Sequence, residues 1–162
     1  MKNIGYNNSV AIIGANSFLG LQIAMAIGNA YRLLLIDSDV AQTSLMASKI
    51  KNKIQLPSNV EILSCSKDAS WEADIIVLAS PTVTHPSIAK KIAEVTTCKT
   101  ILQLVYTSDE GLSIKNILPY SYVIKVNINH SNAIVEGENA EALELAMQLL
   151  SFTSWNIMKK TI

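Results

Sequence analysis

The sequence lacks the features that define several common classes of protein. Its two cysteines, Cys65 and Cys98, have neither CxxC spacing nor nearby histidines, so we expect buried free thiols and no metal site. The 13 Lys and Arg residues balance 13 Asp and Glu residues without a basic run, which argues against a nucleic-acid partner. No signal peptide precedes Val10, and no apolar run reaches the roughly 18 residues of a membrane helix. We therefore expect a cytoplasmic protein with no membrane partner.

Several catalytic motifs are also missing. No tyrosine has a lysine four residues later, which excludes the proton relay of short-chain dehydrogenases, and neither a Gly-x-Ser-x-Gly elbow nor a phosphate-binding P-loop occurs. What the chain does have is a hydrophobic content of 49% over 162 residues. This composition fits a single domain with a sheet buried on both faces.

Apolar runs alternate with helical patterns along the chain. The patterns predict strands at 10–14, 32–37, 60–64, 75–81, 100–106, 122–126, 133–136 and 155–158, the strand at 133–136 resembling an edge strand. They predict helices at 18–27, 40–50, 86–95, 113–118 and 138–152, and a polar connection with about one helical turn at 67–74. This alternation is typical of a doubly wound, mostly parallel sheet between two layers of helices. We therefore predict one three-layer α/β domain of the Rossmann type over residues 1–162, with a tail at 1–9.

The first predicted strand leads into a turn that runs from Gly14 to Gly20. A helix that begins directly after a buried strand points free N–H groups and its positive dipole end at a site where a pyrophosphate can bind. The dinucleotide fingerprint has glycines at its first, third and sixth places, which here hold Gly14, Asn16 and Leu19. In the spacing of extended short-chain dehydrogenases, Ser17 replaces the middle glycine. Asn16 tolerates a positive φ, but we expect its side chain to narrow the approach to a phosphate.

An acidic residue, Asp37, ends the second predicted strand 23 residues after Gly14. At this spacing a carboxylate accepts the hydroxyl hydrogens of the adenosine ribose and repels a 2′-phosphate, which favours NAD over NADP. No Lys or Arg follows until Lys49. In the alternative interpretation Asp37 is only a turn or helix-capping residue, a role that Ser38 or Asp39 could also take.

Residues on the nicotinamide side are expected at the ends of the fourth and fifth strands. The fourth strand stops at Pro81, because proline cannot continue a central ladder. The predicted cofactor-binding residues are Gly14, Asn16, Ser17, Phe18, Leu19, Gly20, Asp37, Ser38, Ala79, Ser80, Pro81 and Thr107.

The two histidines, His85 and His130, are both expected in loops at the carboxyl end of the sheet. Oxidation of an alcohol needs a base for the hydroxyl proton, and histidine titrates near neutral pH. A histidine in a loop is more often a solvated surface residue. We take His130 as the catalytic candidate.

With these landmarks placed, the chain resembles the NAD-binding domain shared by 3-hydroxyacyl-CoA dehydrogenases and the wider 6-phosphogluconate-dehydrogenase-like group. In the first half of the chain the resemblance rests on the glycine turn and on residues 34–37 and 73–81. In the second half it rests on Thr107 and Ser108, on Ser113, Ile114 and Leu118, and on residues 135–137, which precede a helix with Leu149 and Leu150. Deazaflavin-dependent NADP reductases share much of this pattern. The resemblance implies an NAD-dependent oxidoreductase that acts on a small-molecule substrate.

The chain differs from this group at the positions of the group's catalytic residues. The group has a catalytic histidine after the sixth strand and a glutamate after the fourth, and the matching positions hold Asn127 and, approximately, Thr82. His130 lies three residues beyond Asn127. The helical second domain, which completes the substrate site and commonly the dimer in the group, is expected to be absent.

Three functions remain open. The first is an active dehydrogenase whose pocket a partner chain or a homodimer completes, and the second is a nucleotide-binding protein or redox sensor without turnover. The third is a structural α/β interaction domain. The apolar C-terminal residues Phe152, Trp155, Ile157 and Ile162 favour self-association.

Overall fold

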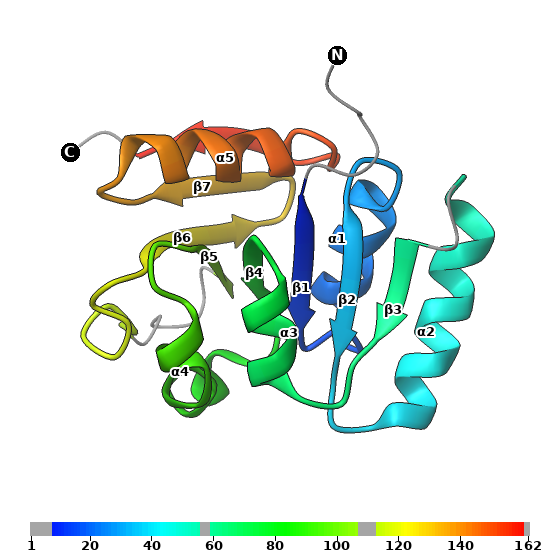
Figure 1. The fold of residues 1–162 in the computed structure, drawn as a ribbon. Helices are drawn as coiled ribbons and strands as arrows, with labels where there is room; N and C mark the ends of the chain where they lie inside the picture. The colour runs from blue at the N-terminus through cyan, green and yellow to red at the C-terminus, as the bar shows by residue number, and fades with distance from the viewer. Residues whose placement is uncertain (1–7, 56–58, 107–112, 161–162) are drawn as a thin grey trace, which may run out of the picture.

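The computed structural model describes residues 8–55, 59–106 and 113–160. Within them, eight strands form one sheet in the order β3-β2-β1-β4-β5-β6-β7-β8 (Figure 1). The strands are β1 (Ser9–Ile13), β2 (Arg32–Ile36), β3 (Val60–Ile62), β4 (Ile75–Leu78), β5 (Thr100–Tyr106), β6 (Tyr122–Asn129), β7 (Asn132–Glu136) and β8 (Asn156–Lys159). All neighbours from β3 to β6 are parallel, β7 is antiparallel to β6, and β8 is parallel to β7. The mostly parallel, doubly wound sheet predicted from the sequence is confirmed.

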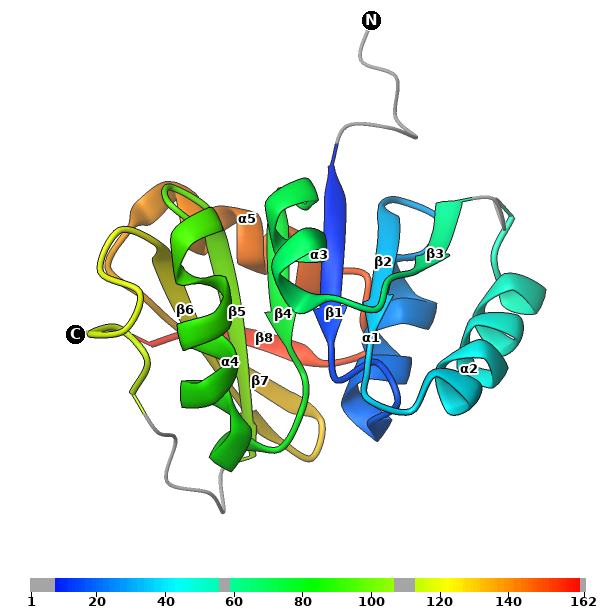
Figure 2. The same ribbon diagram turned by 60° about the horizontal axis from the view of Figure 1, so that its bottom comes forward.

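Helices cover both faces of this sheet. The helices α1 (Phe18–Ile27), α2 (Val40–Lys53) and α5 (Ala140–Leu150) pack on one face, and α3 (Ser66–Glu72) and α4 (His85–Ile92) on the other (Figure 2). Short 3₁₀ turns, η2 (Thr82–Thr84) and η3 (Ala93–Val95), flank α4. The three-layer arrangement is therefore the predicted one.

The central strands of the sheet, β2, β1, β4 and β5, are buried on both sides, as the apolar composition predicted. Val10 and Ile12 of β1 belong to the core under α1, α2 and α5, whereas Ala11 and Ile13 belong to the core under α3 and α4. Successive side chains of a strand point to opposite faces, so a continuous apolar run fills both layers.

The strand order reverses at β1, which has β2 on one side and β4 on the other. The connections that follow β1 and β4 therefore lead to opposite faces of the sheet. In open α/β sheets a ligand binds at the carboxyl ends of the strands at such a reversal. This is the edge at which the glycine turn lies.

Three local predictions were wrong. Residues 113–118 form a single turn and no helix: the Ile114 carbonyl accepts the N–H groups of Ile117 and Leu118, and Pro119 has no N–H with which to continue. The strand β7 is not an edge, because β8 pairs with its outer side. Residues 66–72 form a seven-residue helix, longer than the single turn expected, because Ala69 and Ser70 are buried.

The thiols also differ from the expectation. Cys65 and Cys98 are free, but both are exposed. Cys65 directly precedes α3, and Cys98 lies in a turn with φ of 61°. Turns between elements run over the surface, so neither thiol reaches the core.

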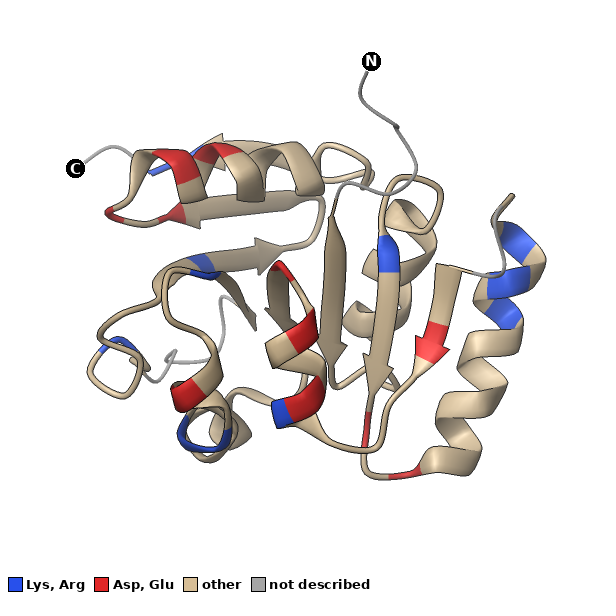
Figure 3. Cartoon of the chain, in the orientation of Figure 1, with Lys and Arg blue, Asp and Glu red and all other residues tan. Residues whose placement is uncertain are grey.

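The charged residues are dispersed over the molecule, apart from a group of lysines at the C-terminal end of α2 (Figure 3). No helix in the described part of the chain has the length and apolar character needed to cross a membrane.

Candidate functional site

The glycine turn brings β1, α1 and the end of β4 into close contact. Gly14 has φ of 88°, and a Cβ atom there would lie 2.3 Å from the backbone nitrogen of Ser80. A Cβ atom on Gly20 would lie 2.4 Å from the carbonyl oxygen of Gly14. Only glycine fits at either position, so both glycines allow α1 to start directly against the sheet.

Ser17 fixes the first turn of α1. Its Oγ accepts the N–H of Gly20 at 3.0 Å and lies 2.7 Å and 2.9 Å from the carbonyl oxygens of Gly14 and Ala79, to either of which the hydroxyl can donate. The hydroxyl is therefore occupied by the fold. The N–H groups of Phe18 and Leu19 have no acceptor within the helix, because they belong to its first turn.

Asp37 lies beside this turn. Its Oδ2 accepts the backbone N–H of Asn16 at 2.9 Å, and its Oδ1 accepts the backbone N–H of Ser38 at 2.7 Å. A carboxylate can accept about four hydrogen bonds, so the half-buried Asp37 retains capacity for hydroxyl donors. The structure thus places the predicted ribose residue next to the predicted phosphate turn.

Asn16, which replaces the middle glycine of the fingerprint, bridges the two loops. Its Nδ2 donates to the carbonyl oxygen of Asp39 at 3.1 Å. Its Oδ1 is buried and has no hydrogen-bond partner. The side chain therefore connects the turn after β1 with the loop after β2, and it does so with one polar atom unsatisfied.

The end of β4 is held in place by His85. This residue is fully buried at the start of α4, with Nε2 2.8 Å from the carbonyl oxygen of Ser80 and Nδ1 3.1 Å from Nε2 of Gln103. Because a carbonyl only accepts, Nε2 carries the proton and Nδ1 accepts from the Gln103 amide. Burial lowers the pKa of His85, although the hydrogen bond to Ser80 opposes this shift. His85 is a neutral core residue and not the solvated loop residue that the sequence indicated.

The predicted nicotinamide-side residues differ in exposure. Ala79 is buried, Ser80 is half-buried with its hydroxyl 2.9 Å from that of Thr84, and Pro81 is exposed. Thr107 lies outside the described residues. The carbonyl oxygen of Ala79 lies within hydrogen-bond distance of the Ser17 hydroxyl, and that of Ser80 accepts from His85. Only the exposed surface of this segment is therefore accessible to a ligand.

A pocket of about 580 Å³ lies between the start of α1 and the carboxyl ends of β5 and β6. Its apolar lining comes from Phe18, Leu19, Tyr106, Ile128 and Trp155. Gln22, Asn129 and His130 supply its polar lining. The pocket adjoins the first turn of α1, on the side away from Asp37 and β2.

His130 occupies the tight turn between β6 and β7. It is exposed and has φ of 51°, a conformation that histidine adopts more readily than most residues. Asn127, at the position of the catalytic histidine in the resembled group, alternates with the core residues Val126 and Ile128 and so points to the opposite face of β6. His130 and not Asn127 therefore lines the pocket.

Sequence reasoning missed Gln22, Tyr106, Asn129 and Trp155 as pocket residues. Tyr106 ends its predicted strand, a position that could have identified it, whereas Asn129 lies three residues past the predicted end of its strand. Gln22 follows Phe18 by one helical turn, so it shares the helix face on which the pocket opens. Trp155 gave no local signal, because the pairing of β8 with β7 brings it to the pocket.

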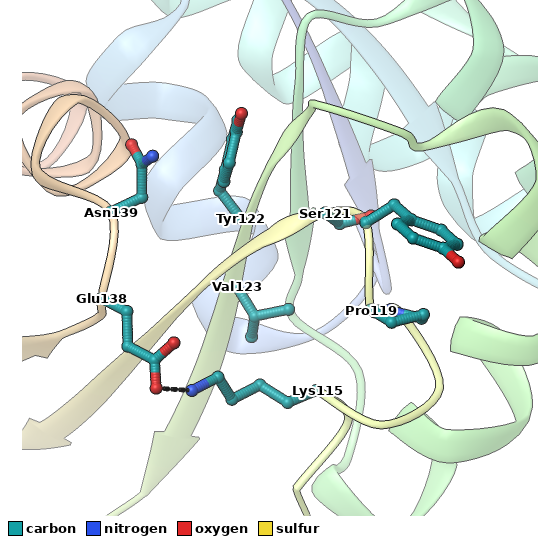
Figure 4. Close-up of a pocket in the computed structure, with 8 residues that line it drawn as sticks. Lys115, Pro119, Ser121, Tyr122, Val123, Glu138 and Asn139 are labelled. Atoms are coloured by element: carbon teal, nitrogen blue, oxygen red, sulfur yellow. Dashed lines mark hydrogen bonds and ion pairs between the residues drawn. The ribbon is translucent and has the colours of Figure 1, made fainter.

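A second pocket, of about 350 Å³, lies at the other end of β6 (Figure 4). Lys115 and Glu138 form an ion pair there, and the side chain of Asn139 caps α5 by accepting the N–H of Ala142. Among the described residues that line this pocket, the lysine is paired. The pocket contains Tyr122, the first residue of β6, and so lies at the amino end of that strand. This pocket is thus separate from the edge that carries Gly14 and Asp37.

The sequence matches no protein-family model and no curated protein sequence. Solved structures match its fold over nearly the whole chain. A protein assigned as an F420-dependent NADP-reductase from Arthrobacter sp. FB24 has a TM-score of 0.70 at 16% identity, covering 94% of this chain and 84% of its own. A pyrroline-5-carboxylate reductase from Coxiella burnetii has a TM-score of 0.75 at 13% identity, covering 96% and 59%.

The (S)-3-hydroxybutyryl-CoA dehydrogenase PaaH1 from Ralstonia eutropha has a TM-score of 0.70 at 14% identity, covering 94% of this chain and 62% of its own. The chain thus spans about three fifths of the length of the last two proteins. The Rossmann-type fold predicted from the sequence is confirmed by these likenesses.

Proposed function

We propose that this chain is an NAD-binding Rossmann domain of an oxidoreductase. The observation that carries the proposal is the juxtaposition, along one edge of the sheet, of the free N–H groups at the start of α1, the Asp37 carboxylate and the pocket that contains His130. Proteins with the same fold include enzymes named as an NADP-reductase, a pyrroline-5-carboxylate reductase and a 3-hydroxybutyryl-CoA dehydrogenase.

The residues at this edge fit a dinucleotide. The N–H groups of Phe18 and Leu19 would hold the pyrophosphate, and Asp37, with Ser38 beside it, would hold the adenosine ribose. The nicotinamide half would run past residues 79–81 toward the pocket. When bound, the dinucleotide supplies or accepts a hydride. The departure from this fit is Asn16, whose unpaired Oδ1 leaves an acceptor where the fingerprint has a glycine.

NAD is the preferred cofactor in this proposal. The two oxygens of Asp37 are acceptors, which suit ribose hydroxyls and oppose a 2′-phosphate. The backbone donors at Asn16 and Ser38 already bond to Asp37.

His130 would hold the proton that the substrate oxygen gains or loses. An imidazole exchanges protons near neutral pH, and the pocket leaves this one accessible.

The proposal includes a cytoplasmic location and a homodimer that completes the substrate pocket.

Calorimetric titration with NADH and, separately, NADPH tests the proposal. NADH should bind more tightly than NADPH, and Asp37→Ala should weaken NADH binding by about 10-fold or more, because a charge-assisted hydrogen bond contributes about 1.5–3 kcal/mol. Asp68→Ala is the matched control, since it removes an exposed carboxylate from α3 on the other face. If neither dinucleotide binds to the wild-type protein, the proposal is wrong.

A further inference from the structure

The pocket beside α1 has no Lys, Arg, Asp or Glu among its described lining residues. Its polar groups are the amides of Gln22 and Asn129 and the imidazole of His130. Burying a carboxylate or phosphate without a partner of opposite charge costs several kcal/mol. The described side chains of the pocket therefore offer hydrogen bonds to a ligand but no counter-charge for an anion.

The rest of the lining is apolar and partly aromatic. Phe18 is 75% exposed and Tyr106 45% exposed, whereas Trp155 is 7% exposed. Phe18 occupies the first position of α1, so its ring stands at the mouth of the pocket next to the free N–H groups of that helix. Exposed aromatic side chains that share one concave surface with polar groups are typical of a small-molecule site.

We propose that this pocket binds a small, uncharged carbonyl compound with an apolar body, and that it rejects substrates that carry a carboxylate or phosphate there. Phe18, Tyr106 and Trp155 surround the apolar body, and the amide groups of Gln22 and Asn129 and the imidazole of His130 bond the carbonyl oxygen. The inference rests on the proposed function in one respect: Phe18 and Leu19 border both this pocket and the proposed pyrophosphate site.

The indole N–H signal of Trp155 in ¹H–¹⁵N NMR spectra reports binding directly. The chain has two tryptophans, and Trp71 is exposed on α3, so Trp71→Phe leaves Trp155 as the single indole. Cyclohexanone and cyclohexanecarboxylate share a ring and differ in charge. Titrations with and without NAD⁺ should shift the Trp155 signal with cyclohexanone at concentrations at least 10-fold lower than with the carboxylate.

A second experiment tests whether a cation placed in the pocket makes it accept the carboxylate. Gln22→Lys introduces a cation into the pocket and should lower the half-saturating concentration of the carboxylate at least 10-fold, whereas Gln148→Lys, on the exposed side of α5, should leave both titrations unchanged. Equal responses to the two probes, or no response to cyclohexanone, would overturn the inference.

The two proposals fail separately. If NADH binds in the calorimeter but cyclohexanone leaves the Trp155 signal in place, the pocket assignment is wrong and the cofactor assignment stands. If cyclohexanone binds as described but no dinucleotide does, the pocket assignment stands and the oxidoreductase proposal is wrong.

Discussion

Asn16 is the residue at which the chain departs most from a dinucleotide-binding turn. Its amide donates to the Asp39 carbonyl, and its Oδ1 is buried without a partner. An unsatisfied buried acceptor costs about 1–3 kcal/mol, so the bridge between the two loops is a weak one. A ligand that entered between them would displace a side chain that the fold does not hold tightly.

Replacement of Asn16 by glycine should therefore strengthen NADH binding several-fold. The change removes the bridging side chain and keeps the backbone N–H that bonds Asp37. Calorimetry measures the affinity. Asn16→Asp is the contrasting variant, because it keeps the size but adds a negative charge beside the proposed pyrophosphate site, and it should weaken binding. Weaker binding by Asn16→Gly would show that the amide helps to hold the ligand.

For single residues, the sequence predicted the chemical type of the site residues better than it predicted the contacts that these residues make. The spacing of Gly14 and Asp37 predicted their proximity, because both follow neighbouring parallel strands. It could not predict that the Asn16 amide bonds the Asp39 carbonyl, because that contact depends on how the chain turns after β2. The burial of His85 was missed for a related reason, since its hydrogen-bond partner Gln103 lies 18 residues further along the chain, in β5.

At the scale of elements, the junction of β4, α4 and β5 is organised by His85. Its Nε2–H holds the Ser80 carbonyl, and Ser80 in turn abuts Gly14. His85 therefore holds in place the segment that packs against the glycine turn, and it is itself too deeply buried to contact a ligand. The same junction makes the stability of the fold depend on pH.

The free energy of unfolding should decrease as the pH falls below about 6.5. The folded pKa of His85 is lowered from its ordinary value of 6.5, so below that value the unfolded chain binds a proton that the folded chain does not. The slope for this one group is at most about 1.4 kcal/mol per pH unit. Urea unfolding between pH 5 and 7.5 measures it.

Two variants assign this dependence to its source. His85→Gln keeps a donor for Ser80 but no longer titrates, so its profile should be flatter over the same range. His130→Gln removes the second histidine at the exposed turn, so comparison of the two profiles assigns the slope to one residue. A slope that survives in His85→Gln would place the titrating group elsewhere.

The elements themselves were predicted well where periodicity was long and undisturbed. The bounds of α1 and β5 agree with the predictions, whereas the structure adds a helix-capping role for Ser17 that was not predicted. The strand β6 continues to Asn129, three residues past the predicted end, because its polar last residues pair with β7 across a tight turn. The polar residues at this end of β6 predicted an earlier end of the strand, but their pairing with β7 keeps them in it. The local pattern does not reveal that partner strand.

At the scale of the whole molecule, the proposed site is assembled from distant parts of the chain. The first turn of α1, the ends of β5 and β6 and the residue before β8 surround one pocket, while Asp37 lies on the other side of the glycine turn. The alternation of strands and helices predicted a doubly wound, mostly parallel sheet, and the order of its strands comes from the structure. The pairing of β8 with β7, which adds Trp155, lies beyond that pattern.

A ligand that binds along this edge contacts several elements that must be folded together, so it should stabilise the whole domain. At a free NADH concentration 100 times the dissociation constant, the added stability is about 2.7 kcal/mol, which for a domain of this size raises the melting temperature by about 5–10 °C. Thermal unfolding followed by circular dichroism measures the shift. NADPH at the same concentration should give a smaller shift, and Asp37→Ala should lose most of the NADH effect. Its shift is measured from its own melting temperature without ligand, which should be lower than that of the wild type because the N–H groups of Asn16 and Ser38 lose their acceptor. An equal shift with NADPH, or one that survives in Asp37→Ala, would mean that the molecule recognises the pyrophosphate and not the ribose.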